Sequence, residues 1–191
     1  GLPTGLIAAL ILGAMITMTG AMHEDGLADC ADGFWGEWQA ERRLEIMKDS
    51  AIGTYGTLAL ILSLLARWSA ISVLIDASWL AGPLICAALG SRAAMVGVMH
   101  YLPPTRGDGL SRSSGQPDAQ DLILASAVAL IGALLLTGFA AITAALVAVM
   151  LAFALSRLAL AKIGGQTGDV LGASQQITEI GMLVTFAALA T

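Results

Sequence analysis

Four carboxylates stand within nine residues near the start of the chain. Glu24, Asp25, Asp29 and Asp32 lie in the stretch HEDGLADCADGFWG, directly after the apolar run Leu6 to Ala21. If this stretch continues the preceding helix, Asp25, Asp29 and Asp32 follow an i, i+4, i+7 pattern and point within about 60° of one another. Carboxylates so close repel one another unless a cation neutralises them. Oxygen ligands suit Mg²⁺ or Mn²⁺ better than zinc, so we predict a metal site here, with Glu24 as a further ligand. A solvated acidic helix end is the alternative.

A second polar cluster, KIGGQTGDVLGASQQITE, stands near the end of the chain. Gly165 and Gly168 belong to a glycine-rich turn before an apolar helix, where backbone N–H groups can bind a phosphate. Asp169 follows as another candidate metal ligand. Gln175 and Glu179 are i, i+4 partners that point to one side of the helix. We therefore predict that this segment contributes phosphate and substrate contacts.

Basic residues near these clusters suit an anionic ligand. Lys48 precedes the second apolar helix, Arg92 lies inside the third, and Lys162 lies just beyond the fifth. A charge within a membrane costs roughly 2.5–3.5 kcal/mol on insertion scales and usually faces a functional interior. We predict that these three bind diphosphate oxygens, with a structural ion pair as the alternative for Arg92. Arg67 is expected to be structural, and Arg157 suits either a phosphate contact or the membrane interface.

Metal ligands, cations and a phosphate-binding turn together predict phosphoryl transfer from a diphosphate. A metal would stabilise the leaving phosphate while the protein positions the reactants. One carboxylate would accept the proton of an attacking hydroxyl, Asp32 being the first candidate and Asp49 the second. Gly26 and Gly33 are expected to interrupt the acidic helix and so to leave room for the ligand.

Composition indicates that these residues are positioned by a membrane bundle. The chain has 191 residues, of which 57% are hydrophobic and 12% charged, against about 25% charged residues in water-soluble domains. No basic patch suggests nucleic acid. A spanning helix needs roughly 20 apolar residues, which predicts an all-α, polytopic bundle with about six membrane helices in a single domain, 1–191. The predicted spans are 5–22, 52–75, 79–101, 121–139, 141–161 and 170–190.

The connections between these spans alternate between polar and very short. The polar ones, 23–51, 102–120 and 162–169, contain Lys and Arg, whereas the short ones contain neither. By the positive-inside rule the polar connections face the cytoplasm, so we expect the acidic segment 23–51 and the active site at the cytoplasmic face of the cell membrane. The composition of segment 102–120, rich in Pro, Gly and Ser, predicts a flexible loop, either a passive connector or a lid.

A transporter is the rival function from another class. Transporters also gather charges at a site inside a bundle, and Arg67, Arg92 and Glu179 would serve that purpose. A transporter, however, predicts charges near the bilayer centre and polar connections on both faces. The concentration of charge at one face favours an enzyme.

Four motifs in order, HEDGLADCADGFWG, ERRLEIMKDSAIGTYG, SRAAMVGVMHYLPP and GGQTGDVLGASQQITE, resemble the cobalamin synthase (adenosylcobinamide-GDP ribazoletransferase) family over essentially the whole chain. The resemblance implies a Mg²⁺-dependent enzyme of a bacterial or archaeal inner membrane. It would join adenosylcobinamide-GDP to α-ribazole or its 5′-phosphate and release GMP, completing adenosylcobalamin.

The resemblance also bears on the extent and the partners of the chain. Family members are usually longer at the N-terminus, which implies that an opening helix is missing here. A homo-oligomer and association with other corrinoid-pathway enzymes are further expectations, alongside contact with membrane lipid.

A looser similarity concerns the CDP-alcohol phosphotransferases, which also cleave a diphosphate. Their signature begins D-x-x-D-G, which Asp29, Asp32 and Gly33 match. Gly36 and Glu37 stand where that signature has A-R, and its later acidic motif is not found downstream. We keep this family as the alternative function.

Overall fold

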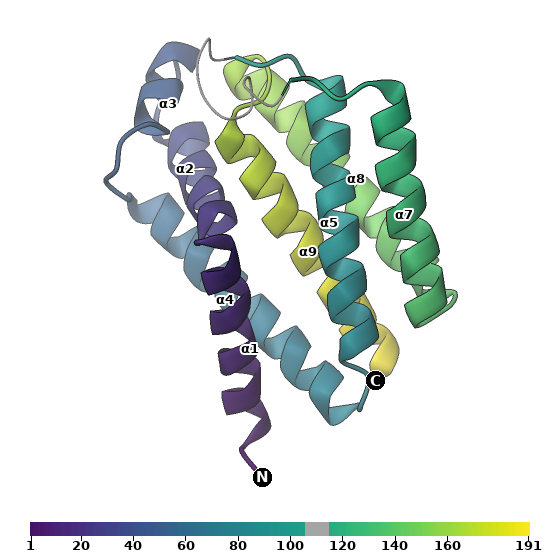
Figure 1. The fold of residues 1–191 in the computed structure, drawn as a ribbon. Coiled ribbons are helices and arrows are strands. Elements are labelled where there is room, and N and C mark those ends of the chain that lie inside the picture. The colour runs from purple at the N-terminus through teal and green to yellow at the C-terminus, as the bar shows by residue number, and fades with distance from the viewer. Residues whose placement is uncertain (106–114) are drawn as a thin grey trace.

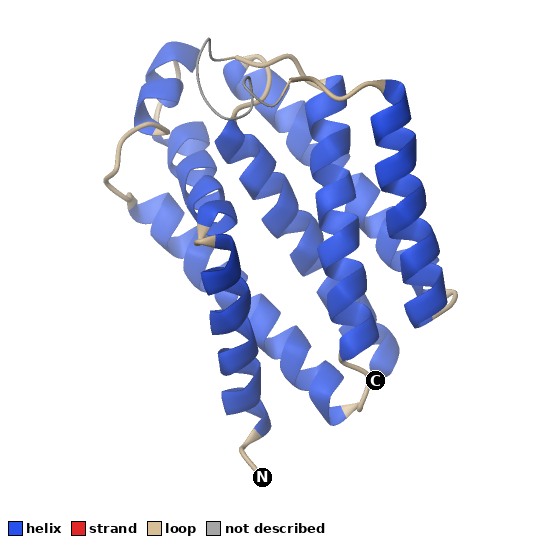
Figure 2. Cartoon of the chain, in the orientation of Figure 1, coloured by secondary structure: helices blue, strands red, loops and turns tan. Residues whose placement is uncertain are grey.

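The computed structural model describes residues 1–105 and 115–191, and within these ranges every regular element is a helix (Figures 1 and 2). This confirms the predicted all-α class. The helices are α1 (Thr4–Thr19), α2 (Met22–Gly36), α3 (Ala40–Ile46), α4 (Thr54–Asp76), α5 (Ala81–Tyr101), α7 (Ala119–Thr137), α8 (Ala140–Ile163) and α9 (Gly168–Ala190).

The membrane spans follow the long apolar runs of the sequence. Four helices, α4, α5, α7 and α8, are long and apolar enough to cross a membrane, and α1 and α2 meet the same criterion only as a bent pair. Each of the six predicted ranges coincides with a helix. Four of them match α4, α5, α7 and α8, and the other two match α1 and α9. The count of about six is therefore roughly consistent with the structure.

The expectation that the acidic stretch continues the first helix is wrong. The chain breaks at Gly20 and Ala21, whose φ angles are +62° and +57°, and α2 leaves α1 at 87°. Glycine adopts this left-handed conformation at little cost, whereas alanine rarely does. The bend turns α2 away from the axis of α1 and against α9.

The most polar long helix, α9, lies in the middle of the bundle. It packs against α2, α4, α5 and α8 (Figure 1). Its side chains Gln175, Gln176 and Glu179 are each at most 2% exposed. Lipid tails offer no hydrogen-bond partners, so the surrounding helices must cover these groups.

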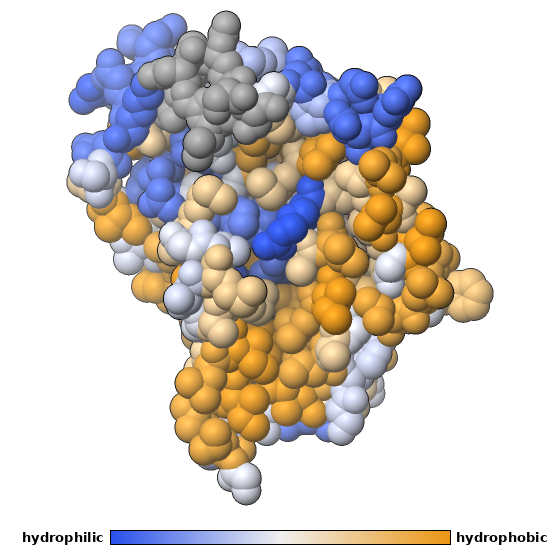
Figure 3. Space-filling model, in the orientation of Figure 1, coloured by the Kyte–Doolittle hydropathy of each residue, from blue (hydrophilic) through white to orange (hydrophobic). Residues whose placement is uncertain are grey.

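The outer surface is apolar over most of the bundle. Leu135, Phe139 and Val149 are among its exposed side chains. Figure 3 shows this apolar surface below a hydrophilic cap. We call the capped end the polar end; it carries α3, the C-terminal end of α5 and the α8–α9 turn (Figure 1).

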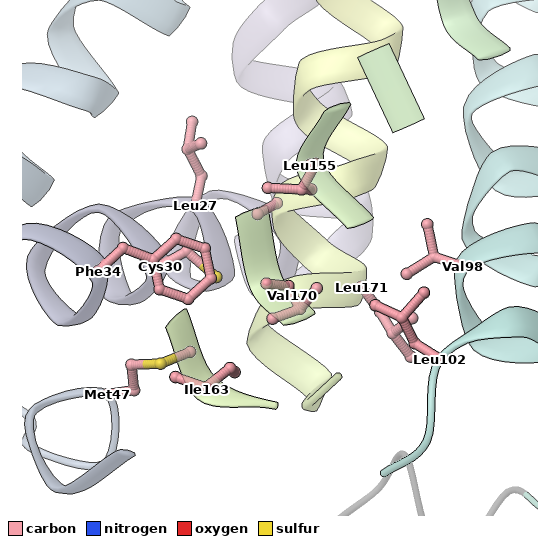
Figure 4. Close-up of a cluster of buried hydrophobic side chains, with 12 residues drawn as sticks. Leu27, Cys30, Phe34, Met47, Val98, Leu102, Leu155, Ile163, Val170 and Leu171 are labelled. Atoms are coloured by element: carbon pink, nitrogen blue, oxygen red, sulfur yellow. The ribbon is translucent and has the colours of Figure 1, made fainter. Parts of the chain in front are cut away.

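An apolar cluster packs α2 against α8 and α9 in the half of the bundle next to the polar end, which we call the polar half. Figure 4 shows Cys30 and Phe34 of α2 meeting Ile163 of α8 and Val170 of α9. Met47, which follows α3, completes this part of the cluster. Because these side chains are almost fully buried, the cluster fixes the position of α2 relative to α8 and α9.

Candidate active site

The acidic stretch forms one continuous helix, α2, so the i, i+4, i+7 spacing of its aspartates is realised. Gly26 and Gly33, however, do not interrupt it. A Cβ atom on Gly26 would lie 2.7 Å from the backbone oxygen of Asp169, and one on Gly33 would collide with Met47. Both glycines therefore permit close packing against neighbouring segments, rather than close approach of a ligand.

The three aspartates of α2 lie in different environments. Asp25 is exposed, Asp29 is half-buried and Asp32 is buried. One carboxylate oxygen of Asp32 accepts a hydrogen bond from Gly53 N (2.7 Å) and the other from Gly56 N (2.9 Å). Asp32 thus satisfies N–H groups at the start of α4, where a negative charge also complements the helix dipole. This geometry favours a structural role for Asp32 over the predicted metal ligand or general base.

Replacing Asp32 by asparagine is expected to destabilise the protein by about 1.5–3 kcal/mol, the usual contribution of hydrogen bonds to a charged group. An Asp32→Asn side chain presents an amide N–H to a backbone N–H, so one donor at the start of α4 loses its acceptor. Equilibrium unfolding in mixed detergent micelles measures the change.

The matched control for this variant is Asp49→Asn. Asp49 is exposed and accepts only a local hydrogen bond, from Ala51 N at 3.2 Å, so its stability should be nearly unchanged. Unaltered stability of Asp32→Asn together with lost activity would contradict the capping role and favour the general base.

Glu24 does not join Asp25 and Asp29 at the surface. Its Oε1 atom lies 3.0 Å from a guanidinium nitrogen of Arg67 and accepts a hydrogen bond from Gln176 at 3.1 Å. The other terminal nitrogen of Arg67 lies 3.5 Å from Glu179. The structure therefore places Glu24 in a buried ion-pair arrangement of α2, α4 and α9, which favours a structural role over the predicted metal ligand. The structural role expected for Arg67 agrees with this geometry.

Amide and hydroxyl groups extend this arrangement. Gln175 donates to Glu179 (2.6 Å) and to Ser91 (3.3 Å), and Gln176 donates to Gln175 (2.9 Å). Gln175 and Glu179 are thus engaged inside the bundle, which favours a structural role over the predicted substrate contact. We call the whole set the buried polar network; it comprises Glu24, Ser63, Arg67, Ser91, Gln175, Gln176 and Glu179.

The glycine-rich turn is fixed by the connection that follows α5. Gln166 N donates to Pro103 O (2.9 Å), and Thr105 N donates to Gln166 O (3.0 Å). A Cβ atom on Gly165 would collide with Pro103 O, whereas Gly168 has open space around it. Gly165 is therefore a packing residue, and Gly168, at the start of α9, is the glycine left for the predicted phosphate contact.

The predicted flexible segment 102–120 is tethered at both described ends. Residues 103–105 pair with Gln166, and Pro117 O lies 2.8 Å from Nδ1 of His100. Asp118 caps α7 by accepting from Asp121 N at 2.9 Å. Residues 106–114 lie outside the described part of the chain.

The predicted cations lie at different depths. Arg92 is exposed on α5, its guanidinium donates to Ala88 O at 3.0 Å, and it interacts electrostatically with His23 of α2 and Glu179 of α9. Figure 3 shows a hydrophilic hollow in this region, over α9 and between α2 and α5. Lys48 is exposed after α3.

Lys162 and Arg43 connect α8 to the acidic segment. The ammonium group of Lys162 lies 5.4 Å from the ring centroid of Trp35 on α2, a cation–π contact. Arg43, 7% exposed, donates to the backbone oxygens of Glu37 and Lys162, both at 2.8 Å. Sequence reasoning missed this role of Arg43, because its only local signal is its place in a run of charged residues.

The candidate active site is the part of the polar half formed by α2, α5 and the start of α9. Asp25 and Asp29 lie one turn apart on α2, and the contact of Gly26 with Asp169 brings this turn of α2 next to the first turn of α9. In residues 1–105 and 115–191, no group of three or more His, Cys, Asp or Glu side chains is arranged to hold a metal.

Two carboxylates nevertheless fit the requirements of Mg²⁺. This ion usually binds proteins through one or two carboxylates and completes its coordination with water and substrate phosphates. Asp25 and Asp29 offer that number of donors. Asp32 accepts from the start of α4, and Glu24 is paired with Arg67. The arrangement is suited to binding a phosphorylated ligand together with a cation.

Fold and site together define a polytopic membrane protein with acidic and basic groups gathered in the polar half of its bundle. A family model described as cobalamin-5-phosphate synthase matches residues 1–187. The chain belongs to the cobalamin-5-phosphate synthase family.

Curated relatives support this assignment. An adenosylcobinamide-GDP ribazoletransferase of Mesorhizobium japonicum is 45% identical over 96% of this chain and 71% of its own length. One of Bradyrhizobium diazoefficiens is 46% identical over 98% of this chain and 73% of its own length. No solved structure matches the chain.

Proposed function

We propose that this chain transfers the cobinamide phosphate of adenosylcobinamide-GDP to the ribose hydroxyl of α-ribazole or its 5′-phosphate, with release of GMP. Family membership over residues 1–187 supports the reaction. The structural observation that carries the proposal is the placement of Asp25 and Asp29 beside the first turn of α9, in the same half of the bundle as Arg92.

Each part of this site has a distinct task in the proposed reaction. Arg92 is the cation that faces the diphosphate, since its guanidinium is exposed and, among residues 1–105 and 115–191, donates a hydrogen bond only to Ala88 O. The open N-terminal turn at Gly168 suits a phosphate oxygen. Lys48 and Lys162 remain candidate phosphate contacts at the polar end, and Asp49 remains a candidate proton acceptor.

Asp25 and Asp29 would hold Mg²⁺, and Mn²⁺ has the same preference for oxygen ligands. When bound, the ion would neutralise the charge that develops on the leaving phosphate. Asp169 contributes to the negative potential near this position, and its carboxylate accepts a hydrogen bond from Thr167 at 3.1 Å.

The polar end is proposed to face the cytoplasm of a bacterial or archaeal cell membrane. The arginines and lysines of the polar connections support this orientation by the positive-inside rule. The phosphate groups of adenosylcobinamide-GDP and of α-ribazole 5′-phosphate are charged and hydrated. These substrates would therefore reach the hollow from this side without crossing the bilayer.

The test is GMP release by the purified chain in detergent, from adenosylcobinamide-GDP and α-ribazole 5′-phosphate, with Mg²⁺ and with excess EDTA. We expect release that requires both substrates and falls to background when the metal is removed. Readdition of Mg²⁺ or Mn²⁺ should restore it, whereas Zn²⁺ should restore it poorly.

Three outcomes would overturn parts of this proposal. GMP release that persists undiminished in EDTA would exclude the metal site. A folded chain with no release would exclude the reaction, and CDP-alcohol substrates would be assayed next. Movement of substrate into vesicles without bond cleavage would instead support the transporter.

A further inference from the structure

A cavity of about 640 Å³ lies between α5, α7 and α8, apart from the candidate active site. None of its lining residues belongs to the buried polar network. Small side chains on α5 and α8, including Gly97, Ala148 and Ala152, leave the space, and exposed apolar groups such as Val149 and Phe153 border it. The cavity is therefore an apolar groove on the membrane-facing side of the bundle.

One end of the groove is charged. Among the described lining residues, Arg157 is the one ionised side chain, and it is accompanied there by Ser156 and Tyr101. Arg157 is exposed and takes part in none of the ion pairs found in residues 1–105 and 115–191. Because it stands six residues before the end of α8 at Ile163, its Cα lies about 9 Å below the polar end.

The groove has the length of one membrane leaflet. Its lining on α8 runs from Ala145 to Leu160, and the part from Ala145 to Arg157 corresponds to about 18 Å at the rise of an α-helix. The hydrocarbon core of a bilayer is about 30 Å thick, so an acyl chain entering at Arg157 would end near the bilayer centre. A cation at that depth also lies within reach of the lipid phosphates by extending its side chain toward the interface.

We propose that this groove binds an anionic phospholipid, with one acyl chain along α8 and the phosphate against Arg157. The charge of Arg157 is complementary to an anionic headgroup, and the remaining lining is complementary to a hydrocarbon chain. Tyr101 and Ser156 provide hydroxyl groups for the headgroup oxygens. A zwitterionic lipid offers the same acyl chain but no net negative charge, so Arg157 makes the site selective for anionic lipids.

The test is native mass spectrometry of the full chain released from nanodiscs that contain equal amounts of phosphatidylglycerol and phosphatidylcholine. We expect one phosphatidylglycerol to be retained in preference to phosphatidylcholine. Arg157→Gln should lower that preference several-fold, in line with the attraction of a single arginine for an anionic membrane.

A second variant tests the groove itself. A Cβ atom on Gly97 would lie 3.8 Å from the side chain of Leu122, which is an ordinary van der Waals contact. Gly97→Leu therefore fills the groove without a backbone collision and should reduce retention of both lipids. Leu135→Phe is the matched control, because Leu135 is 82% exposed on α7 and does not line the groove.

Three results would overturn the proposal. They are equal retention of the two lipids by the parent protein, unchanged retention in both groove variants, and dissociation of a dimer by Gly97→Leu without any change in lipid. The last result would assign the groove to a second copy of the chain. Thermal unfolding of each variant in the same nanodiscs separates these results from misfolding.

Discussion

Asp25→Asn and Asp29→Asn are each expected to lower kcat/KM for GMP release by on the order of 10²–10³-fold, the usual effect of removing one preorganised group that stabilises developing charge. Each variant removes one of the two α2 carboxylates proposed to hold Mg²⁺, while asparagine keeps the size of the side chain. The measurement is initial GMP release over a Mg²⁺ titration. A metal ligand predicts that part of the loss is recovered at high Mg²⁺.

Asp76→Asn is the matched control for both variants. Asp76 ends α4 at the opposite end of the bundle and accepts a hydrogen bond from Thr4 at 2.8 Å. The same substitution there should leave GMP release and its dependence on Mg²⁺ unchanged. Full activity of both α2 variants would exclude this pair of carboxylates as the metal site, even if the parent enzyme requires Mg²⁺.

Replacing Arg67 by methionine is expected to destabilise the fold by about 3–5 kcal/mol, the effect of breaking a buried ion pair from one side. Arg67 is 1% exposed and lies between Glu24 and Glu179. Arg67→Met removes the guanidinium that pairs with both buried carboxylates, at the point where α2, α4 and α9 meet. Equilibrium unfolding in mixed micelles measures the loss.

The combined variant Glu24→Gln, Arg67→Met and Glu179→Gln separates this charge effect from lost packing. All three side chains are then neutral, and glutamine at position 24 still accepts from Gln176. We expect most of the lost stability to return, because a neutral set avoids the desolvation of unpaired charge. If the triple variant is as unstable as Arg67→Met, the arrangement stabilises the bundle by packing and not by charge pairing.

The exposed ion pair of Arg42 and Glu45 provides a comparison for the buried ion pairs of Arg67. These side chains form an ion pair on α3 at the surface, where such pairs contribute little to stability. Arg42→Met should therefore leave the unfolding midpoint nearly unchanged. A large effect at this position would indicate that α3 is coupled to the bundle by more than the buried contacts of Arg43.

The sequence alone determined the features that depend on local period and composition. The six apolar runs predicted six of the helices, and the helix assumed over 23–34, on which the i, i+4, i+7 spacing of Asp25, Asp29 and Asp32 depends, is present in α2. The four motifs sufficed to recognise the family. Each of these inferences rests on neighbours a few residues apart, whose relation in a helix is fixed by its geometry.

Only the tertiary structure decided which acidic groups take buried structural partners. Asp32 and Glu24 looked equivalent to Asp25 and Asp29 in the sequence, but their partners Gly56, Arg67 and Gln176 stand 24, 43 and 152 residues away. The left-handed conformation of Ala21, which turns α2 against α9, has no sequence signal either. The physical reason is that a buried polar group takes whichever partner the packed helix faces bring to it, and this choice depends on the whole bundle.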